Sequence, residues 1–227
     1  MNDNKEQEVI CQVWGKASAC MDSMGRKSNL FIPAPDRAAL VVVDMQNFVC
    51  SPTDGRSLPG MEKVVEKINQ LVDFCHNINI PVIWLRQNFN RINGKDDAGL
   101  YSAFHKSPLA RGMYNQGADT DIYPAMHLNK NDHVLLKNRY SAFAPGSSFL
   151  DSLLTELSRN QLILCGVATN VCVESTARDA MQKNYQVILA SDAATAFDEV
   201  IHQVSLINIK LFYGDIMETE EILKVFC

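Results

Sequence analysis

The chain has 227 residues, 47% of them hydrophobic and 21% charged, with a formal net charge of -5. This length fits one α/β domain with a sizeable core. Because the chain is mildly acidic and has no basic run, we expect neither nucleic acid nor a membrane surface as a partner. The N-terminus lacks the pattern of a signal peptide, and no segment approaches the roughly 20 apolar residues of a membrane span, so we expect a cytoplasmic protein.

The first 37 residues show weak periodicity and are predicted to form an N-terminal arm that precedes a domain over residues 38–227. Apolar residues such as Val9, Ile10, Val13 and Trp14 give the arm a means of packing on that domain. The seven cysteines have scattered spacings and form no C-x-x-C pair, which favours free thiols over a zinc or redox motif. The five histidines also lack ligand spacing.

From residue 38 onward, apolar runs of strand length alternate with segments of helical periodicity. The predicted strands cover residues 38–43, 80–85, 133–136, 162–166, 187–190 and 209–213. The predicted helices cover residues 61–78, 147–157, 170–182, 198–207 and 218–226. Six strands alternating with helices predict a single-domain, Rossmann-like α/β fold, with a parallel six-stranded sheet between two helical layers. The long polar segment 88–126 is expected to be a functional loop, and whether it acts as a lid stays open.

Three chemically complementary residues fall at the ends of predicted strands, where ligands bind in sheets of this kind. Asp44 follows the first strand, Lys137 the third, and Cys172 lies in the turn after the fourth. A helix start and a nearby lysine would lower the pKa of the Cys172 thiol, and Asp44 could accept its proton and return it to a leaving amine. Backbone N–H groups of the turn 166–172 suit an oxyanion hole. A buried ion pair without chemistry is the structural alternative.

Three segments resemble the isochorismatase-like cysteine hydrolases in motif order and spacing, over a region that runs from about Asp36 to the end. They are AALVVVDMQNF at residues 38–48, KNRYSAF at residues 137–143 and GVATNVCVESTARDA at residues 166–180. The resemblance implies a catalytic triad of Cys172, Asp44 and Lys137. It further implies a cis peptide between Val167 and Ala168, which turns the N–H groups of Ala168 and Cys172 into the oxyanion hole, and a homodimer or homotetramer.

Within that family, Cys172 favours the hydrolases of C–N bonds over isochorismatases proper, which lack this cysteine and cleave a vinyl ether. Nicotinamidases bind a metal through an Asp-x-His pair after the second strand, but residues 86–90 read RQNFN, so we expect no metal and no other cofactor. The motif wording is most similar to ureidoacrylate amidohydrolases. We therefore expect a metal-independent enzyme that cleaves a small amide, ureido or carbamoyl substrate through a covalent acyl-enzyme.

The same resemblance places substrate contacts at Gln87, Phe89 and Tyr140. The ureidoacrylate enzymes carry Asn and Trp where this chain has Gln87 and Phe89, so the identity of the substrate stays open. Phe48 is either an apolar wall of the pocket or a core aromatic. Two other functions also stay open: vinyl-ether hydrolysis, and binding without catalysis on the same scaffold.

Overall fold

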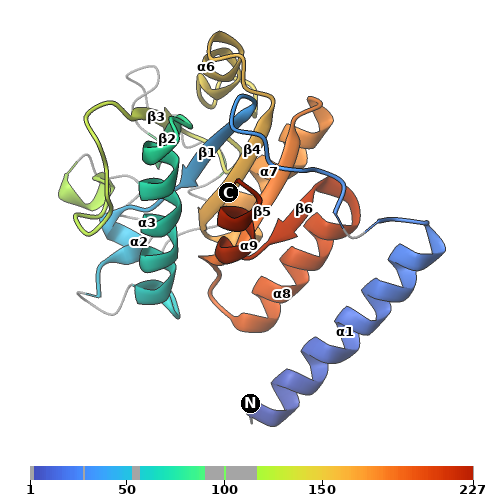
Figure 1. Ribbon diagram of the computed structural model, residues 1–227. Coiled ribbons are helices and arrows are strands. Elements are labelled where there is room, and N and C mark those ends of the chain that lie inside the picture. The colour runs from blue at the N-terminus through green and yellow to red at the C-terminus, as the bar shows by residue number, and fades with distance from the viewer. Residues whose placement is uncertain (1–2, 28, 53–56, 90–99, 101–116, 227) are drawn as a thin grey trace.

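The computed structural model describes residues 3–27, 29–52, 57–89, 100 and 117–226 (Figure 1). It contains a six-stranded sheet in the order β3-β2-β1-β4-β5-β6, and every neighbouring pair of strands is parallel. This confirms the predicted α/β class. The strands are β1 (Ala38–Val43), β2 (Val82–Gln87), β3 (His133–Lys137), β4 (Gln161–Val167), β5 (Gln186–Thr195) and β6 (Asp215–Met217).

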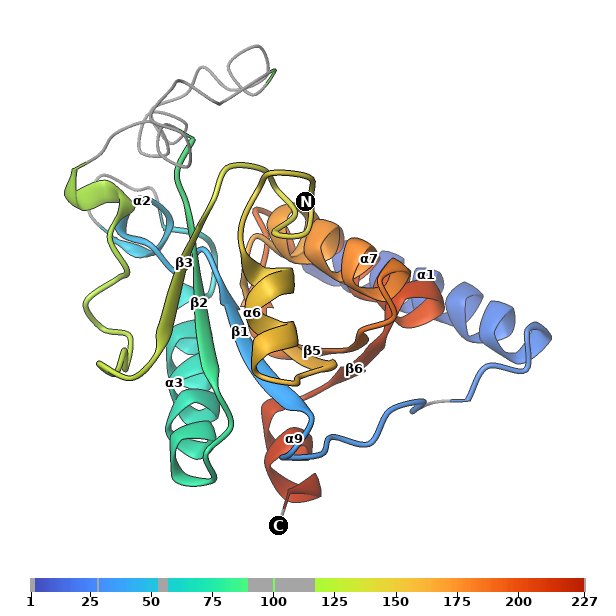
Figure 2. The same cartoon turned by 90° about the horizontal axis from the view of Figure 1, so that it is seen from above.

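Helices cover both faces of this sheet and create two separate hydrophobic clusters (Figures 1 and 2). One face is covered by α3 (Met61–Asn77) and α9 (Thr219–Val225), and the other by α6 (Leu150–Glu156), α7 (Glu174–Gln182) and α8 (Glu199–Asn208). Shorter turns are α2 (Asn47–Cys50), the 3-10 turn η2 (Ala118–Thr120) and the π-helical turns η3 (Thr169–Val173) and η4 (Ile209–Tyr213). None of the helices in the described part of the chain combines the length and hydropathy of a membrane span.

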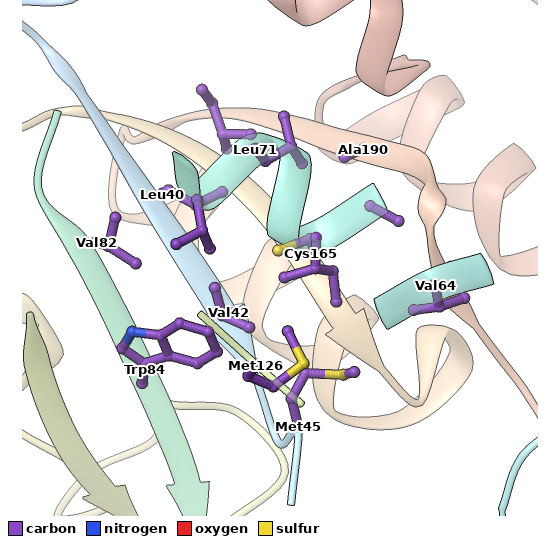
Figure 3. Close-up of a cluster of buried hydrophobic side chains, with 14 of the residues drawn as sticks. Leu40, Val42, Met45, Val64, Leu71, Val82, Trp84, Met126, Cys165 and Ala190 are labelled. Carbon is purple, nitrogen blue, oxygen red and sulfur yellow. The ribbon is translucent and has the colours of Figure 1, made fainter. Parts of the chain in front are cut away.

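The central strands carry aliphatic side chains on both faces because both faces are covered. In β1, Leu40 and Val42 point into the cluster beneath α3, whereas Val41 and Val43 belong to the opposite cluster. Figure 3 shows the first cluster, where Leu40 lies beside Val82 and Val42 beside Trp84 of β2. A continuous apolar run is typical of such a strand, which is why the sequence predicted the bounds of β1 correctly.

The sixth strand was predicted at the wrong residues. Residues 209–213, read as a strand, form the π-helical turn η4 that continues α8, and the true edge strand β6 begins at Asp215. A short apolar run does not distinguish a strand from a buried helical turn by periodicity alone. Gly214 separates the two elements, and a Cβ atom on it would lie 2.5 Å from the carbonyl oxygen of Val187. The close approach of β6 to β5 therefore requires glycine there.

The N-terminal arm contains a helix, α1 (Asp3–Ser23), that its weak periodicity did not predict. Helix α1 packs beside α8, where Ile10 and Ala17 are buried and the Trp14 indole N–H donates to Gln203 Oε1 at 2.8 Å (Figure 1). The residues after α1 are anchored to β6, because the backbone N–H groups of Leu30 and Phe31 donate to the Asp215 carboxylate at 2.6 and 2.8 Å. The arm is therefore bound to the C-terminal elements of the domain.

Candidate active site

The structure brings Asp44, Lys137 and Cys172 together at the carboxyl end of the sheet. Lys137 Nζ lies 2.9 Å from Asp44 Oδ2 and donates to Cys172 Sγ at 3.3 Å. All three residues are buried, with 3%, 0% and 4% of their surfaces exposed. The strand order explains the meeting: β1 lies between β2 and β4, and β3 flanks β2, so the ends of β1, β3 and β4 are neighbours along one edge.

The backbone of Asp44 has an unusual conformation at the point where β1 ends. Its N–H still donates to Leu85 O in the ladder with β2, at 3.0 Å, but its φ is 53°, in the left-handed region. Few residues other than glycine adopt this conformation, which costs on the order of 1–3 kcal/mol and clusters at functional sites. The surrounding structure therefore fixes the Asp44 carboxylate in one direction, toward Lys137.

The turn that carries Cys172 begins with a close approach between β4 and β1. Gly166 has φ of 107°, and a Cβ atom on it would lie 2.2 Å from Val43 O, so only glycine fits there. The next peptide, Val167–Ala168, is cis, as the resemblance implied. The sequence predicted Cys172 in the first turn of an α-helix. It lies instead in the π-helical turn η3, because α7 begins only at Glu174. Single π-helical turns are frequent at functional sites.

The electrostatics of the triad differ from the expectation of an acidic thiol. Burial raises the pKa of Cys172, the negative charge of Asp44 raises it further, and Lys137 offsets only part of this. Burial also raises the pKa of Asp44, against the opposing effect of Lys137. For Lys137, burial alone would lower the pKa, but the nearby Asp44 and Cys172 raise it overall, so the ammonium group keeps its charge. The site thus combines a carboxylate–ammonium contact with a sulfur whose pKa is raised by burial.

Gln87, at the end of β2, completes the surroundings of the lysine. It is fully buried, and its Oε1 accepts a hydrogen bond from Lys137 Nζ, which also donates to Arg139 O at 3.1 Å. Two buried polar atoms of the site, Gln87 Nε2 and Asp44 Oδ1, have no hydrogen-bond partner of good geometry among the described residues. Buried polar groups are nearly always paired, so an open donor and an open acceptor beside a thiol are suited to a bound polar molecule.

Residues 38–221 match the family model of the isochorismatase domain. This chain belongs to the isochorismatase family. The match covers the sheet and the three site residues, confirms the resemblance drawn from the sequence motifs, and identifies the chain as an isochorismatase-like hydrolase.

Named relatives agree with this assignment. The chain is 32% identical over 210 residues to the ureidoacrylate amidohydrolase RutB of Acinetobacter baylyi, with 85% of each chain covered. It is 34% identical over 189 residues to the enterobactin synthase component B of Escherichia coli, covering 83% of this chain and 63% of that protein. Among solved structures, a cysteine hydrolase from Pseudomonas syringae pv. phaseolicola 1448A aligns with a TM-score of 0.79 and 27% identity, covering 88% of this chain and 96% of that one.

The four predicted substrate contacts of this isochorismatase-like hydrolase fall in different surroundings. Gln87 lies at the triad, as described above. Phe48 is fully buried in the cluster beneath α3, as expected of a core aromatic, and its contact with a substrate stays a prediction. Phe89 is buried and Tyr140 is half-buried against the opposite cluster. Contacts of Phe89 and Tyr140 with a substrate stay predictions.

Two buried polar groups near the site were not found from the sequence. Gln46, two residues after Asp44, is fully buried with its amide bonded to main-chain atoms. Beneath the Cys172 turn, Thr169 Oγ1 and His202 Nδ1 lie 2.9 Å apart, and burial lowers the pKa of His202. Ser205, whose hydroxyl donates to Thr169 O at 3.1 Å, adds a further polar group beside the pair. Within the described residues, no three His, Cys, Asp or Glu side chains gather as metal ligands do.

Proposed function

We propose that this isochorismatase-like hydrolase cleaves a C–N bond of a small amide, ureido or carbamoyl compound, without a metal ion, through a covalent intermediate on Cys172. One observation carries the proposal: a single buried ammonium group, Lys137 Nζ, contacts both the Asp44 carboxylate, at 2.9 Å, and the Cys172 sulfur, at 3.3 Å. A thiol, a carboxylate and a cation in mutual contact are the parts that nucleophilic catalysis by cysteine needs.

The proposed reaction begins with the protonated thiol. As Sγ of Cys172 bonds to the carbonyl carbon, its proton passes to Asp44, and the cation of Lys137 stabilises the negative charge that develops on sulfur. The N–H groups of Ala168 and Cys172 are proposed to bind the oxyanion of the tetrahedral intermediate. When the intermediate collapses, the C–N bond breaks and Asp44 returns the proton to the leaving nitrogen. Water then hydrolyses the thioester or S-carbamoyl group and restores the thiol.

The choice of a C–N bond rests on the residue types in the site and on the relatives. Cys172 supplies the nucleophile that acyl transfer from nitrogen requires, and a relative with 32% identity is named a ureidoacrylate amidohydrolase. The open Gln87 Nε2 donor and Asp44 Oδ1 acceptor suit a substrate that presents both a carbonyl oxygen and an N–H group. A metal-free mechanism is proposed because Gln87, Asn88 and Phe89 occupy the last position of β2 and the two positions after it, where an Asp-x-His ligand pair would stand. A homodimer or homotetramer stays a prediction.

The test is a screen of ureido, carbamoyl and simple amide compounds for ammonia or amine release, with wild type, Cys172→Ala and Asp44→Asn in parallel. We expect at least one compound to be hydrolysed by wild type and by neither variant, and Cys172 to carry the acyl or carbamoyl mass when the reaction is quenched. An isochorismate-like vinyl ether is included in the screen, and its hydrolysis by wild type and Cys172→Ala but not by Asp44→Asn would instead indicate the vinyl-ether type of chemistry. Binding of compounds without turnover by wild type would indicate a non-catalytic role.

A further inference from the structure

The side chain of Gln46 is an unusual polar group in the core beside the active site. It is fully buried, and its amide has three hydrogen-bond contacts with main-chain atoms. Its Nε2 donates to Gln87 O at 3.2 Å and to Thr120 O at 2.7 Å, while its Oε1 accepts from Gln87 N–H at 2.7 Å. One side chain therefore pairs both main-chain groups of Gln87 and connects them to η2.

These contacts complete a closed ring that includes the proposed catalytic residues. Gln46 N–H donates to Asp44 O at 2.8 Å, and the Gln46 amide holds the main chain of Gln87. The side chain of Gln87 accepts from Lys137 Nζ, and Lys137 pairs with Asp44. Each member of the ring thus restricts the next one. The lysine has a flexible stem of four methylene groups, so a fixed partner such as Gln87 limits the positions that its ammonium group can take.

We propose that Gln46 is a positioning residue for the triad. It fixes the end of β2 so that Gln87 Oε1 holds the Lys137 ammonium group between Asp44 and Cys172. The inference rests on the proposed function for the role of Lys137 beside the thiol. An amide is required at this position because only an amide supplies a donor for two carbonyl groups and an acceptor for an N–H group at once. An apolar side chain of the same length would remove the Gln46 partner of both main-chain groups of Gln87, whereas Thr120 O would keep the Arg86 Nε donor at 2.9 Å.

A matched control exists at the amino ends of the strands, opposite the carboxyl ends that carry the site. Gln161, at the start of β4, is also fully buried. Ala34 N–H donates to its Oε1 at 2.7 Å, and its Nε2 donates to Ile32 O at 2.9 Å and to Gln186 Oε1 at 3.0 Å. The variants Gln46→Met and Gln161→Met each remove three hydrogen bonds of a buried amide, one of which goes to a side chain in Gln161, and introduce no charge. Both should lower the unfolding temperature, and only the first should affect the triad.

The readout is the rate of Cys172 alkylation by iodoacetamide between about pH 7 and 10, followed by peptide mass spectrometry, because thiolate is the reactive form. The charged groups that face Cys172 Sγ within the described chain are Asp44, at the end of β1, and Lys137, at the end of β3. If Lys137 moves away, Asp44 acts on the thiol unopposed. We expect Gln46→Met to slow alkylation about tenfold at every pH below the midpoint, which corresponds to a pKa about one unit higher, and Gln161→Met to match wild type.

For any compound that wild type hydrolyses, kcat should fall by about 10- to 100-fold in Gln46→Met with a much smaller change in KM, as misplacement of a reacting group by about 1 Å does. The inference is overturned if Gln46→Met alkylates at the wild-type rate while unfolding at a temperature as low as that of Gln161→Met. If Gln46→Met does not fold, Gln46→Asn, which keeps the amide one methylene shorter, is measured in its place against the same criterion. A wild type that hydrolyses no compound refutes the proposed function, whereas the alkylation rates still decide the role of Gln46.

Discussion

Replacement of Lys137 by methionine tests whether Asp44 is ionised in the folded protein and depends on the Lys137 cation for stability. The change removes the cation and keeps a side chain of similar length, so Asp44 is left buried without its partner. Loss of one member of a buried pair typically costs about 3–5 kcal/mol of unfolding free energy, because a charge then stays desolvated and unpaired. We expect a loss of this size at neutral pH, measured by urea unfolding.

The loss of unfolding free energy in Lys137→Met should increase as pH rises. Burial already raises the pKa of Asp44 in the folded protein, and without Lys137 the largest opposing effect is lost. A carboxyl whose folded pKa lies above its unfolded value near 3.9 binds its proton more tightly in the folded state, so unfolding free energy falls as pH rises from about 4. The slope is about 1.4 kcal/mol per pH unit until the folded group ionises. The destabilisation should therefore be smallest at about pH 4, where only the lost hydrogen bonds of Lys137 remain, and largest by neutral pH.

The double variant Lys137→Met with Asp44→Asn is the control, because it removes both charges. Asparagine tolerates the left-handed backbone of Asp44, so the second change should restore most of the lost stability at neutral pH. A destabilisation by Lys137→Met that is the same at pH 4 and pH 8, within about 0.5 kcal/mol, or that the double variant does not relieve, would refute the assignment of an ionised, buried Asp44.

Two further predictions follow from the geometry of the Cys172 turn and its burial. Gly166→Ala should cost more than about 3 kcal/mol of unfolding free energy, because its Cβ would overlap Val43 O. Gly146→Ala, which has a positive φ of 71° and nothing within 4 Å of its Cβ, should cost only about 1 kcal/mol, and equal losses in urea unfolding would contradict the argument. At neutral pH, iodoacetamide should label the exposed Cys11 faster than Cys172, because burial raises the pKa of Cys172; preferential labelling of Cys172 would point to a stable thiolate.

Much of the fold and the meeting of the triad could be predicted because both depend on local, repetitive signals. The aliphatic run of β1 marks a strand buried on both faces, and a parallel sheet brings the carboxyl ends of its strands to one edge. Asp44, Lys137 and Cys172 could then be placed together without coordinates. The edge of the sheet was harder, since β6 has only three residues and its neighbour η4 is equally apolar.

The energetics of the site could not be predicted in the same way. The direction of the thiol pKa depends on how far burial and Asp44 outweigh Lys137, and those distances arise from packing between strands that are remote in sequence. Gln46 was missed for a related reason. Its partners are main-chain atoms of Gln87 and Thr120, and main-chain groups leave no trace in the sequence. Helix α1 was missed because one stripe of it packs on α8 and the rest is polar or small.

The raised pKa of Cys172 favours a thiol that holds its proton, and such a thiol supplies a proton that the proposed hydrolysis needs. If Cys172 had lost its proton to solvent, the leaving nitrogen would have to obtain one from water within a buried site. With the thiol protonated and Asp44 paired to Lys137, the same proton can pass from sulfur to carboxylate as the C–S bond forms, and from carboxylate to nitrogen as the C–N bond breaks. Burial thus favours a proton held on the Cys172 sulfur. Lys137 makes transfer of this proton to Asp44 possible, because its cation stabilises the negative charge that develops on sulfur during the transfer. The ring through Gln46 and Gln87 matters in this scheme because the cation must already be in place when the charge develops.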